Sequence, residues 1–234
     1  MPQQKKAKNL VFLIAGLVLL AACQPTIRKL KRDAVELDSL HQYKEAINLY
    51  TAILARDPND IDAYFDRAMD KSRLEDHEGS IADFREIVKL DSANTLSFYN
   101  LGVEYGIMKK YEESIYHFNT ALRLKKIDPS QTKSTNILLT EEGSSLIDEG
   151  PYDCPVGQIL FGRGRIYYKS DSIRKAYFDF SNCIGVDYRR GESYFMRGLC
   201  YLSSGMKEDA CKDLNLGYRY GATVALKAIA ENCQ

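Results

Sequence analysis

Cysteine and histidine are the residue types through which this chain could bind a metal or attack a substrate. The chain has six cysteines and three histidines among its 234 residues. A zinc site needs such residues at short spacing, but His41, His77 and His117 have no His or Cys neighbour at that spacing. The sequence also lacks the G-x-S-x-G, H-E-x-x-H and glycine-rich phosphate-loop patterns. We therefore expect no metal, no cofactor and no catalytic residue, and we predict that the protein is not an enzyme.

Cys23, unlike the other cysteines, directly follows an uncharged, apolar N-terminal segment. Three lysines at positions 5, 6 and 8 precede an uncharged run from residue 10 to residue 22. As a helix this run would span about 20 Å, which is too short for a bilayer core that requires roughly 20 apolar residues. A basic start, a short apolar centre and small residues before a boundary are typical of a secretory signal peptide.

Residues 20–23, Leu-Ala-Ala-Cys, resemble the lipobox of bacterial lipoproteins. In those proteins the cysteine thiol is diacylglyceryl-modified and the chain is cut just before it. The resemblance implies removal of residues 1–22 and a lipid on Cys23, and two acyl chains suffice for a stable membrane anchor. Because residue 24 is Gln and not Asp, it also implies the outer membrane, facing the periplasm. The alternative is an ordinary signal peptide in which Cys23 is incidental.

The composition after such a cut limits the classes of partner. The remaining 212 residues would carry 29 basic and 32 acidic side chains, because only three lysines are lost. A net charge of −3 argues against nucleic-acid binding, which needs a basic surface. The basic residues between positions 28 and 32 could contact anionic lipid headgroups, or they could be the solvated face of the first helix.

The rest of the sequence repeats itself with a period of 34 residues. Five blocks align, beginning at residues 27, 61, 95, 157 and 191, and each has two apolar runs at helical spacing around a polar turn. The eighth position is small in every block, as is the twentieth: Ala34, Ala68, Gly102, Gly164 and Gly198, then Ala46, Ser80, Ser114, Ala176 and Ala210. Large residues occupy the fourth and twenty-fourth positions. Because antiparallel helices approach closely only where both are small, the columns predict five packed helical hairpins.

These columns resemble the tetratricopeptide repeat, and the sequence DPND at 57–60 matches the usual turn between its repeats. Ser92, Lys126 and Tyr188 stand where that family usually has proline. The resemblance implies an all-α fold, a right-handed superhelical solenoid of helical hairpins with a polar cap at its end. The expected parts are a lipidated tether at 23–26, repeats 1–3 at 27–128, an insertion at 129–156, repeats 4–5 at 157–220 and a capping helix at 221–234.

Two late cysteines are spaced for a disulfide. Cys211 and Cys233 lie ten and twelve residues on either side of Gly221, where a turn is expected, so antiparallel helices would bring them level. We predict that they pair, and a loop of this size could contribute about 3 kcal/mol. Cys183 and Cys200 occupy columns in which the repeat family usually has alanine, so we expect them to pack in the core. Cys154, within the insertion, would then be the odd thiol.

The resemblance also implies a binding surface. In the tetratricopeptide family the second, fifth, ninth and twelfth positions of the inner helices line a concave groove. These positions here include aromatic, apolar and basic side chains: Phe65, Met69, Tyr99, Val103, Phe161, Arg165, Tyr168, Phe195 and Leu202. They would suit an extended or helical peptide with apolar anchors. Alternatively, the aromatics pack against their own repeats. The asparagine and lysine clamp that some members use for terminal carboxylates is missing here.

The insertion is polar apart from two apolar islands, residues 137–139 and 146–147. Long loops in compact domains are usually functional or disordered, so it either packs against the array or makes a solvated excursion.

Together these features predict a lipid-anchored, non-catalytic interaction scaffold of the bacterial cell envelope. Its partner would be a protein or peptide of the envelope, with no nucleic acid and no metal. One alternative is a carbohydrate- or peptidoglycan-binding protein whose aromatics stack on sugars, although the chain has no Trp. Another is an enzyme within the insertion that uses Glu141, Glu142, Asp148 or Glu149.

Overall fold

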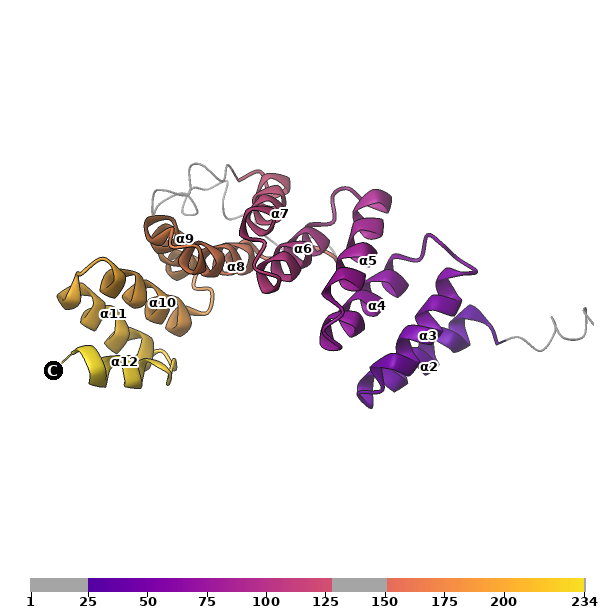
Figure 1. The fold of residues 1–234 in the computed structure, drawn as a ribbon, viewed down its shortest axis with the longest axis horizontal. Helices are drawn as coiled ribbons and strands as arrows, with labels where there is room; N and C mark the ends of the chain where they lie inside the picture. Colours follow the sequence, from indigo (N-terminus) through magenta and orange to yellow (C-terminus); the bar gives the residue numbers. More distant parts are fainter. Residues whose placement is uncertain (1–24, 128–150, 234) are drawn as a thin grey trace, which may run out of the picture. The chain divides into compact units, whose positions relative to one another are not determined.

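The computed structural model describes residues 25–127 and 151–233, and every regular element in those ranges is an α-helix (Figure 1). The chain forms two compact units, Met1–Leu74 and Glu75–Gln234. Cys23, the predicted signal peptide and most of the predicted insertion lie outside the described residues. No helix in the described part of the chain is long and apolar enough to cross a membrane.

The first unit, over residues 25–74, contains three helices, α2 (Ile27–Ser39), α3 (Tyr43–Leu54) and α4 (Ile61–Arg73). Side-chain oxygens cap two of them: Thr26 accepts from the Lys29 amide at the start of α2, and Asp60 accepts from the Ala63 amide at the start of α4. Such caps satisfy backbone donors that have no partner within the helix. The buried core of this unit contains Leu30, Ala34, Ala46, Tyr50, Ile53, Leu54 and Ala63.

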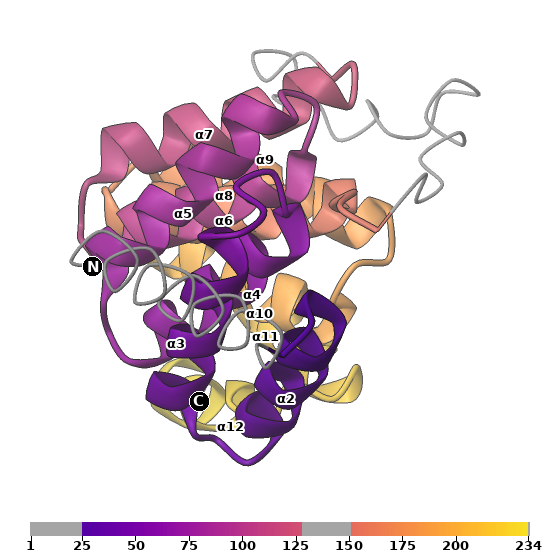
Figure 2. The ribbon, with the colours of Figure 1, turned by 90° about the vertical axis from the view of Figure 1, so that its right-hand side faces the viewer.

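The second unit contains eight helices in its described residues. They are α5 (His77–Leu90), α6 (Thr95–Ile107), α7 (Tyr111–Leu124), α8 (Val156–Lys169), α9 (Ile173–Gly185), α10 (Arg190–Ser203), α11 (Lys207–Arg219) and α12 (Ala225–Asn232). Each helix packs against the next one along the chain, and α8 also contacts both α6 and α10 (Figures 1 and 2). The first helices of repeats 3, 4 and 5 are therefore neighbours.

The small columns are buried at all ten of their positions. A Cβ atom on Gly102 would stand 2.9 Å from the ring of Phe118, and one on Gly164 would stand 3.0 Å from the ring of Phe180. Both rings belong to the twenty-fourth column, which is fully buried as well. The small residue of the first helix therefore makes room for the large residue of the second helix.

The turn inside each repeat has one conformation. Its fifteenth position is left-handed in every repeat, at His41, Glu75, Lys109, Asp171 and Gly205, with φ between 58° and 75° in all five. After α6, the amide of Lys109 donates to the carbonyl of Gly106 and that of Lys110 donates to Tyr105. This pairing closes the end of a helix by satisfying its last carbonyls. A non-glycine residue in the left-handed conformation costs roughly 1 kcal/mol, and four of the five turns have such a residue.

A buried ion pair joins the two helices of repeat 4. Arg163 on α8 is fully buried, and its Nε and Nη2 donate to the two carboxylate oxygens of Asp179 on α9, at 2.9 and 2.6 Å. Its remaining nitrogen, Nη1, donates to Oδ1 of Asn119 on α7 at 2.7 Å. One guanidinium thus binds its own repeat and the preceding one. Bidentate pairing of this kind is the strongest geometry available to an arginine and a carboxylate.

The same arrangement recurs one repeat later. Arg197 on α10 donates to both oxygens of Asp213 on α11 at 2.6 and 2.9 Å, and its Nη1 donates to Ser181 on α9 at 3.3 Å. In the first unit, Nη1 of Arg67 donates to Thr51 at 3.0 Å. The three arginines hold the seventh position of their repeats, and their acceptors Thr51, Asn119 and Ser181 hold the twenty-fifth position of the preceding repeat.

Repeat 3 joins repeat 2 through different polar groups, because its seventh position is Leu101. Here the arginine comes from the preceding repeat: Arg85 on α5 donates to the Tyr105 hydroxyl at 2.5 Å. Glu104 is buried beside it and pairs with His77 at 2.8 Å, while the Ser80 hydroxyl donates to its other oxygen at 3.3 Å. The junction is therefore polar, and its arginine stands at the twenty-fifth position of the preceding repeat, the column that supplies the acceptor at the other junctions.

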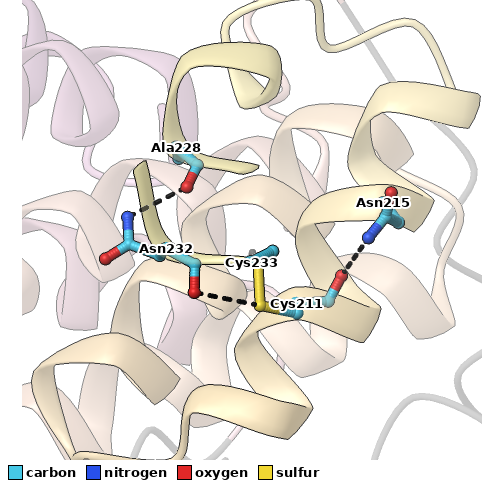
Figure 3. The surroundings of a disulfide bond; sticks show 5 residues. All are labelled: Cys211, Asn215, Ala228, Asn232 and Cys233. Carbon is cyan, nitrogen blue, oxygen red and sulfur yellow. Dashed lines mark hydrogen bonds between the residues drawn. A yellow bond between two sulfur atoms is a disulfide. The ribbon is translucent and has the colours of Figure 1, made fainter. Parts of the chain in front are cut away.

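The last helix is tied down covalently. Cys211 of α11 and Cys233 after α12 form a disulfide, which closes a loop with a sequence separation of 22 residues (Figure 3). Ala222 and Ala225 are buried beneath this end of the chain. A loop of this length contributes about 3 kcal/mol by restricting the unfolded chain. The other described cysteines, Cys154, Cys183 and Cys200, are buried in the second unit.

Breaking the Arg163–Asp179 pair from one side is expected to destabilise the second unit. Asp179→Asn leaves a buried guanidinium without its counter-charge, and we expect a loss of about 3–5 kcal/mol in the free energy of unfolding. The double variant Arg163→Met, Asp179→Leu should recover most of this loss, because no charge stays buried. Urea unfolding followed by circular dichroism measures both.

The exposed pair Lys212–Glu208 supplies the control, and Lys212→Ala should change stability by less than about 0.5 kcal/mol. An Asp179→Asn variant as stable as the wild type would show that the buried pair is not needed.

Candidate functional site

The predicted binding residues divide between the two units. Phe65 and Met69 lie on α4 in the first unit, and both are half-buried. The other seven lie on α6, α8 and α10 in the second unit, where the three helices are in contact. A continuous surface can therefore be described for the second unit.

Phe161 differs from the other predicted aromatic residues. Its side chain is only 7% exposed, because it packs edge-on against Phe180 and Tyr188, with ring centres 5.7 and 6.2 Å away. The guanidinium of Arg189 lies over the same ring, 5.1 Å from its centre. Phe161 thus has little surface left for a partner and acts in packing, as the alternative interpretation of the aromatic column expects.

The remaining residues of the second unit are more accessible. Arg165 is exposed, and the others are half-buried and lie at equivalent positions of three adjacent helices. We call these residues the first-helix surface: Tyr99, Val103, Arg165, Tyr168, Phe195 and Leu202. Tyr99, Val103 and Tyr168 also pack against the core of the unit, so both interpretations apply to them. The hydroxyl of Tyr168 lies 3.4 Å from that of Ser203 on α10, which links α8 to α10.

Tyr99 is the best-defined member of this surface. Burial raises the pKa of its hydroxyl, while a hydrogen bond with the Gln158 side chain and the nearby charges of Arg165 and Arg189 act in the opposite direction. Burial also raises the pKa of Tyr188, with Tyr99 and Arg189 among its neighbours. The Tyr99 hydroxyl therefore bonds to an amide and is within the electrostatic influence of two guanidinium groups.

Sequence reasoning missed Tyr188 and Arg189, because they belong to the connection between α9 and α10 and not to a first helix. A signal was nevertheless present: Tyr188 occupies a position at which proline is usual in the repeat family, and two arginines follow it. Arg189 adopts a left-handed conformation with φ of 43°. A non-glycine residue rarely adopts this conformation, and here its guanidinium lies over Phe161.

The end of the predicted insertion packs into the second unit. The amide of Cys154 donates to the Thr95 hydroxyl at 2.7 Å, and the amide of Leu96 donates to the carbonyl of Tyr152 at 3.0 Å. Asp153 pairs with Lys125 at the end of α7. Residues 151–155 therefore join the start of α6 to the end of α7, close to the Tyr99 end of the first-helix surface.

The first helix of repeat 2, α4, carries carboxylates that are buried or half-buried. Asp70 on α4 is 1% exposed, and Arg73 bridges it to Asp38 on α2 with donor distances of 2.6 and 2.7 Å. Burial, together with the neighbouring Asp38, raises the pKa of Asp70 to about 7, although Arg73 acts in the opposite direction. Burial likewise raises the pKa of Asp66, which hydrogen-bonds Tyr50 of α3. Helix α4 of the first unit thus carries acidic side chains, whereas the first-helix surface of the second unit carries one arginine, Arg165.

Among the described residues, no group of three or more His, Cys, Asp or Glu side chains could hold a metal ion. The three histidines have other contacts. His41 meets the Tyr43 hydroxyl, His77 meets Glu104, and His117 stacks on Tyr105 with ring centres 5.2 Å apart.

Comparison with known proteins identifies the repeat and the fold. Residues 96–128 match the family described as tetratricopeptide repeat, whereas no curated protein matches the chain in sequence. Among solved structures, a tetratricopeptide repeat protein from Parabacteroides merdae is 17% identical, with a TM-score of 0.55 over 99% of this chain and 80% of its own. MamA from Desulfovibrio magneticus is 10% identical, with a TM-score of 0.66 over 84% of this chain and 96% of its own.

PilW, described as a widely conserved type IV pilus biogenesis factor, is 14% identical, with a TM-score of 0.62 over 85% of this chain and 79% of its own. These likenesses confirm the predicted fold class, an all-helical solenoid of the tetratricopeptide type.

The buried carboxyl of Asp70 predicts a pH dependence in the first unit. Its pKa is about 7 in the folded chain against an ordinary 3.8, so the folded state holds the proton more tightly than the unfolded state. The free energy of unfolding should therefore fall as pH rises from about 4 to about 7 and stay level above that, by at most about 4 kcal/mol. Urea unfolding at pH 5 and pH 8 tests this.

Asp70→Asn should remove this difference, because the amide does not titrate. Asp33→Asn, which removes one carboxylate from a more exposed position on α2, should keep it. An unchanged pH slope in Asp70→Asn would contradict the assignment.

Proposed function

We propose that this protein is a lipid-anchored, non-catalytic scaffold of the bacterial cell envelope that binds a protein segment on its first-helix surface. The observation that carries the proposal is that surface. Three adjacent helices present half-exposed aromatic and apolar side chains at equivalent positions, with an exposed arginine among them. Extended or helical peptides with apolar anchors bind surfaces of this kind.

The N-terminal sequence supports the anchor. A basic start, a 13-residue apolar run and Leu-Ala-Ala-Cys at 20–23 are the features of a lipoprotein signal. Gln24 favours the outer membrane, facing the periplasm. The disulfide between Cys211 and Cys233 supports export as well, because disulfides persist in oxidising compartments and are rare in the cytosol.

The comparisons support a role in assembly. PilW has the same fold and is described as a type IV pilus biogenesis factor. By analogy, this chain would hold a component of an envelope machine by reversible docking, with no covalent step. Analogy of fold alone does not identify the component.

Lipid attachment at Cys23 is tested by metabolic labelling with an alkyne-bearing fatty acid. We expect the wild-type protein to become labelled and to sediment with membranes, because the thiol of Cys23 would carry the diacylglycerol. Cys23→Ala should be unlabelled and should not be cut after residue 22. The control is Cys154→Ala, which should still be labelled. Equal labelling of Cys23→Ala would refute the anchor.

Partner binding is tested by crosslinking in intact cells, capture from solubilised membranes and mass spectrometry. The test variant replaces Tyr99, Tyr168 and Phe195 by alanine. The matched control replaces two tyrosines of second helices, Tyr116 and Tyr218, which are 60% and 45% exposed. A partner kept by the wild type and the control but lost at least tenfold by the test variant is expected. If all three proteins capture the same set, the first-helix surface is not the working surface.

A further inference from the structure

The arginines beside Tyr99 indicate which partner chemistry the first-helix surface fits. Arg165 lies on α8, and Arg189 lies in the connection that precedes α10. Arg189 lies over the ring of Phe161, 5.1 Å from its centre, and Arg165 follows Phe161 by one helical turn, so both arginines belong to the same face of α8. Both also act electrostatically on the Tyr99 hydroxyl. We call Tyr99, Arg165, Tyr188 and Arg189 the tyrosine–arginine cluster.

The charge of this cluster is not balanced within the protein. Arg189 pairs with Glu192, with 3.2 Å between Nη2 and Oε1, and both side chains are about half exposed. No carboxylate in the described parts of the chain forms an ion pair with Arg165. Arg165, Arg189 and Glu192 together therefore carry a formal net charge of +1 at the surface. The less exposed arginines Arg163 and Arg197 of the same unit, by contrast, each form a bidentate pair with a carboxylate, Asp179 and Asp213.

The cluster also has a defined shape. Arg189 lies over the ring of Phe161, 5.1 Å from its centre, and a guanidinium stacked on a ring keeps its edge N–H groups available for a carboxylate. The side chains that continue the surface from this point are apolar or aromatic: Val103, Tyr168, Phe195 and Leu202. A fitting ligand therefore combines a negative charge with apolar groups beside it.

We infer that the partner is an acidic protein segment, in which one Asp or Glu side chain binds between Arg165 and Arg189 while neighbouring apolar side chains lie along Val103 and Tyr168. This inference rests on the proposed function and specifies the chemical class of the partner. A single uncompensated charge suits one carboxylate, and electrostatic complementarity of this kind determines which partners bind. The segment binds through a side-chain carboxylate, so it does not need a free chain end.

Selection from a random 12-residue peptide library on the full chain in detergent tests the inference. Peptides retained by the wild type should be enriched in Asp or Glu next to apolar residues. Selection on Arg165→Gln, Arg189→Gln should lose the acidic enrichment and keep the apolar one. The matched control is Arg174→Gln, an exposed arginine on α9 that stacks on Phe178, and it should select the same peptides as the wild type.

The most enriched peptide is then synthesised with its carboxylate intact and with the corresponding amide. For the wild type, the amide should raise Kd about tenfold, since hydrogen bonds to charged groups are strong. For the double glutamine variant, the two peptides should bind alike. Affinity of the acidic peptide should also fall between 50 and 300 mM salt.

Neutral or basic peptides selected through the first-helix surface would overturn the inference and leave the proposed scaffold function intact. Failure to select any peptide, together with partner capture that is insensitive to the Tyr99, Tyr168 and Phe195 replacements, would overturn both.

Discussion

The close approach of two helices across small residues is the constraint on which each hairpin depends. The glycines of the eighth column in repeats 3 and 4 face the rings of Phe118 and Phe180 so closely that an added Cβ would lie about 3 Å from ring carbons. Those rings are in turn buried between helices. Once the small residue is set opposite the large one, the interhelical distance follows, and with it the places at which other side chains of the two helices can meet.

The arginine pairs use that fixed distance. Arg163 and Asp179 are sixteen residues apart on facing helices, and so are Arg197 and Asp213. Each arginine directly precedes the small residue of the eighth column, and each aspartate directly precedes the large residue of the twenty-fourth column. Their geometry leaves one guanidinium nitrogen directed at the preceding repeat, where Asn119 or Ser181 accepts from it. Packing within a repeat and connection between repeats are thus combined in one side chain. Because hydrogen bonds are directional and apolar contacts are not, these pairs make the arrangement of the helices more specific.

The sequence alone was sufficient for the helical hairpins but not for the details of the surface. The small columns recur at a fixed period, and a purely steric requirement such as theirs can be read from residue size. Phe161 shows the limit. It occupies the same column as Tyr99, yet Tyr188 and Arg189 cover it from a connection that lies outside the repeat pattern. The arginine pairs were missed for another reason, since their signal appears only when the seventh and twenty-third columns are compared together. The left-handed turn position carries His, Glu, Lys, Asp and Gly, so residue type says nothing about it.

The recurrence of the arginine link has a consequence for how such a chain changes length in evolution. The arginines of repeats 4 and 5 are 34 residues apart, and each donates to a polar acceptor at the twenty-fifth position of the repeat before it. Loss of one 34-residue unit here would place Arg197 against Asn119, and duplication would place a copied arginine against Ser181. In both cases the arginine would still have a polar acceptor in the preceding repeat. The junction before repeat 3 has no such equivalence, because there the arginine, Arg85, holds the twenty-fifth position and donates to Tyr105 of the next repeat, so donor and acceptor exchange sides. In this polar link the boundaries before repeats 4 and 5 are therefore equivalent, whereas the boundary between repeats 2 and 3 is built differently.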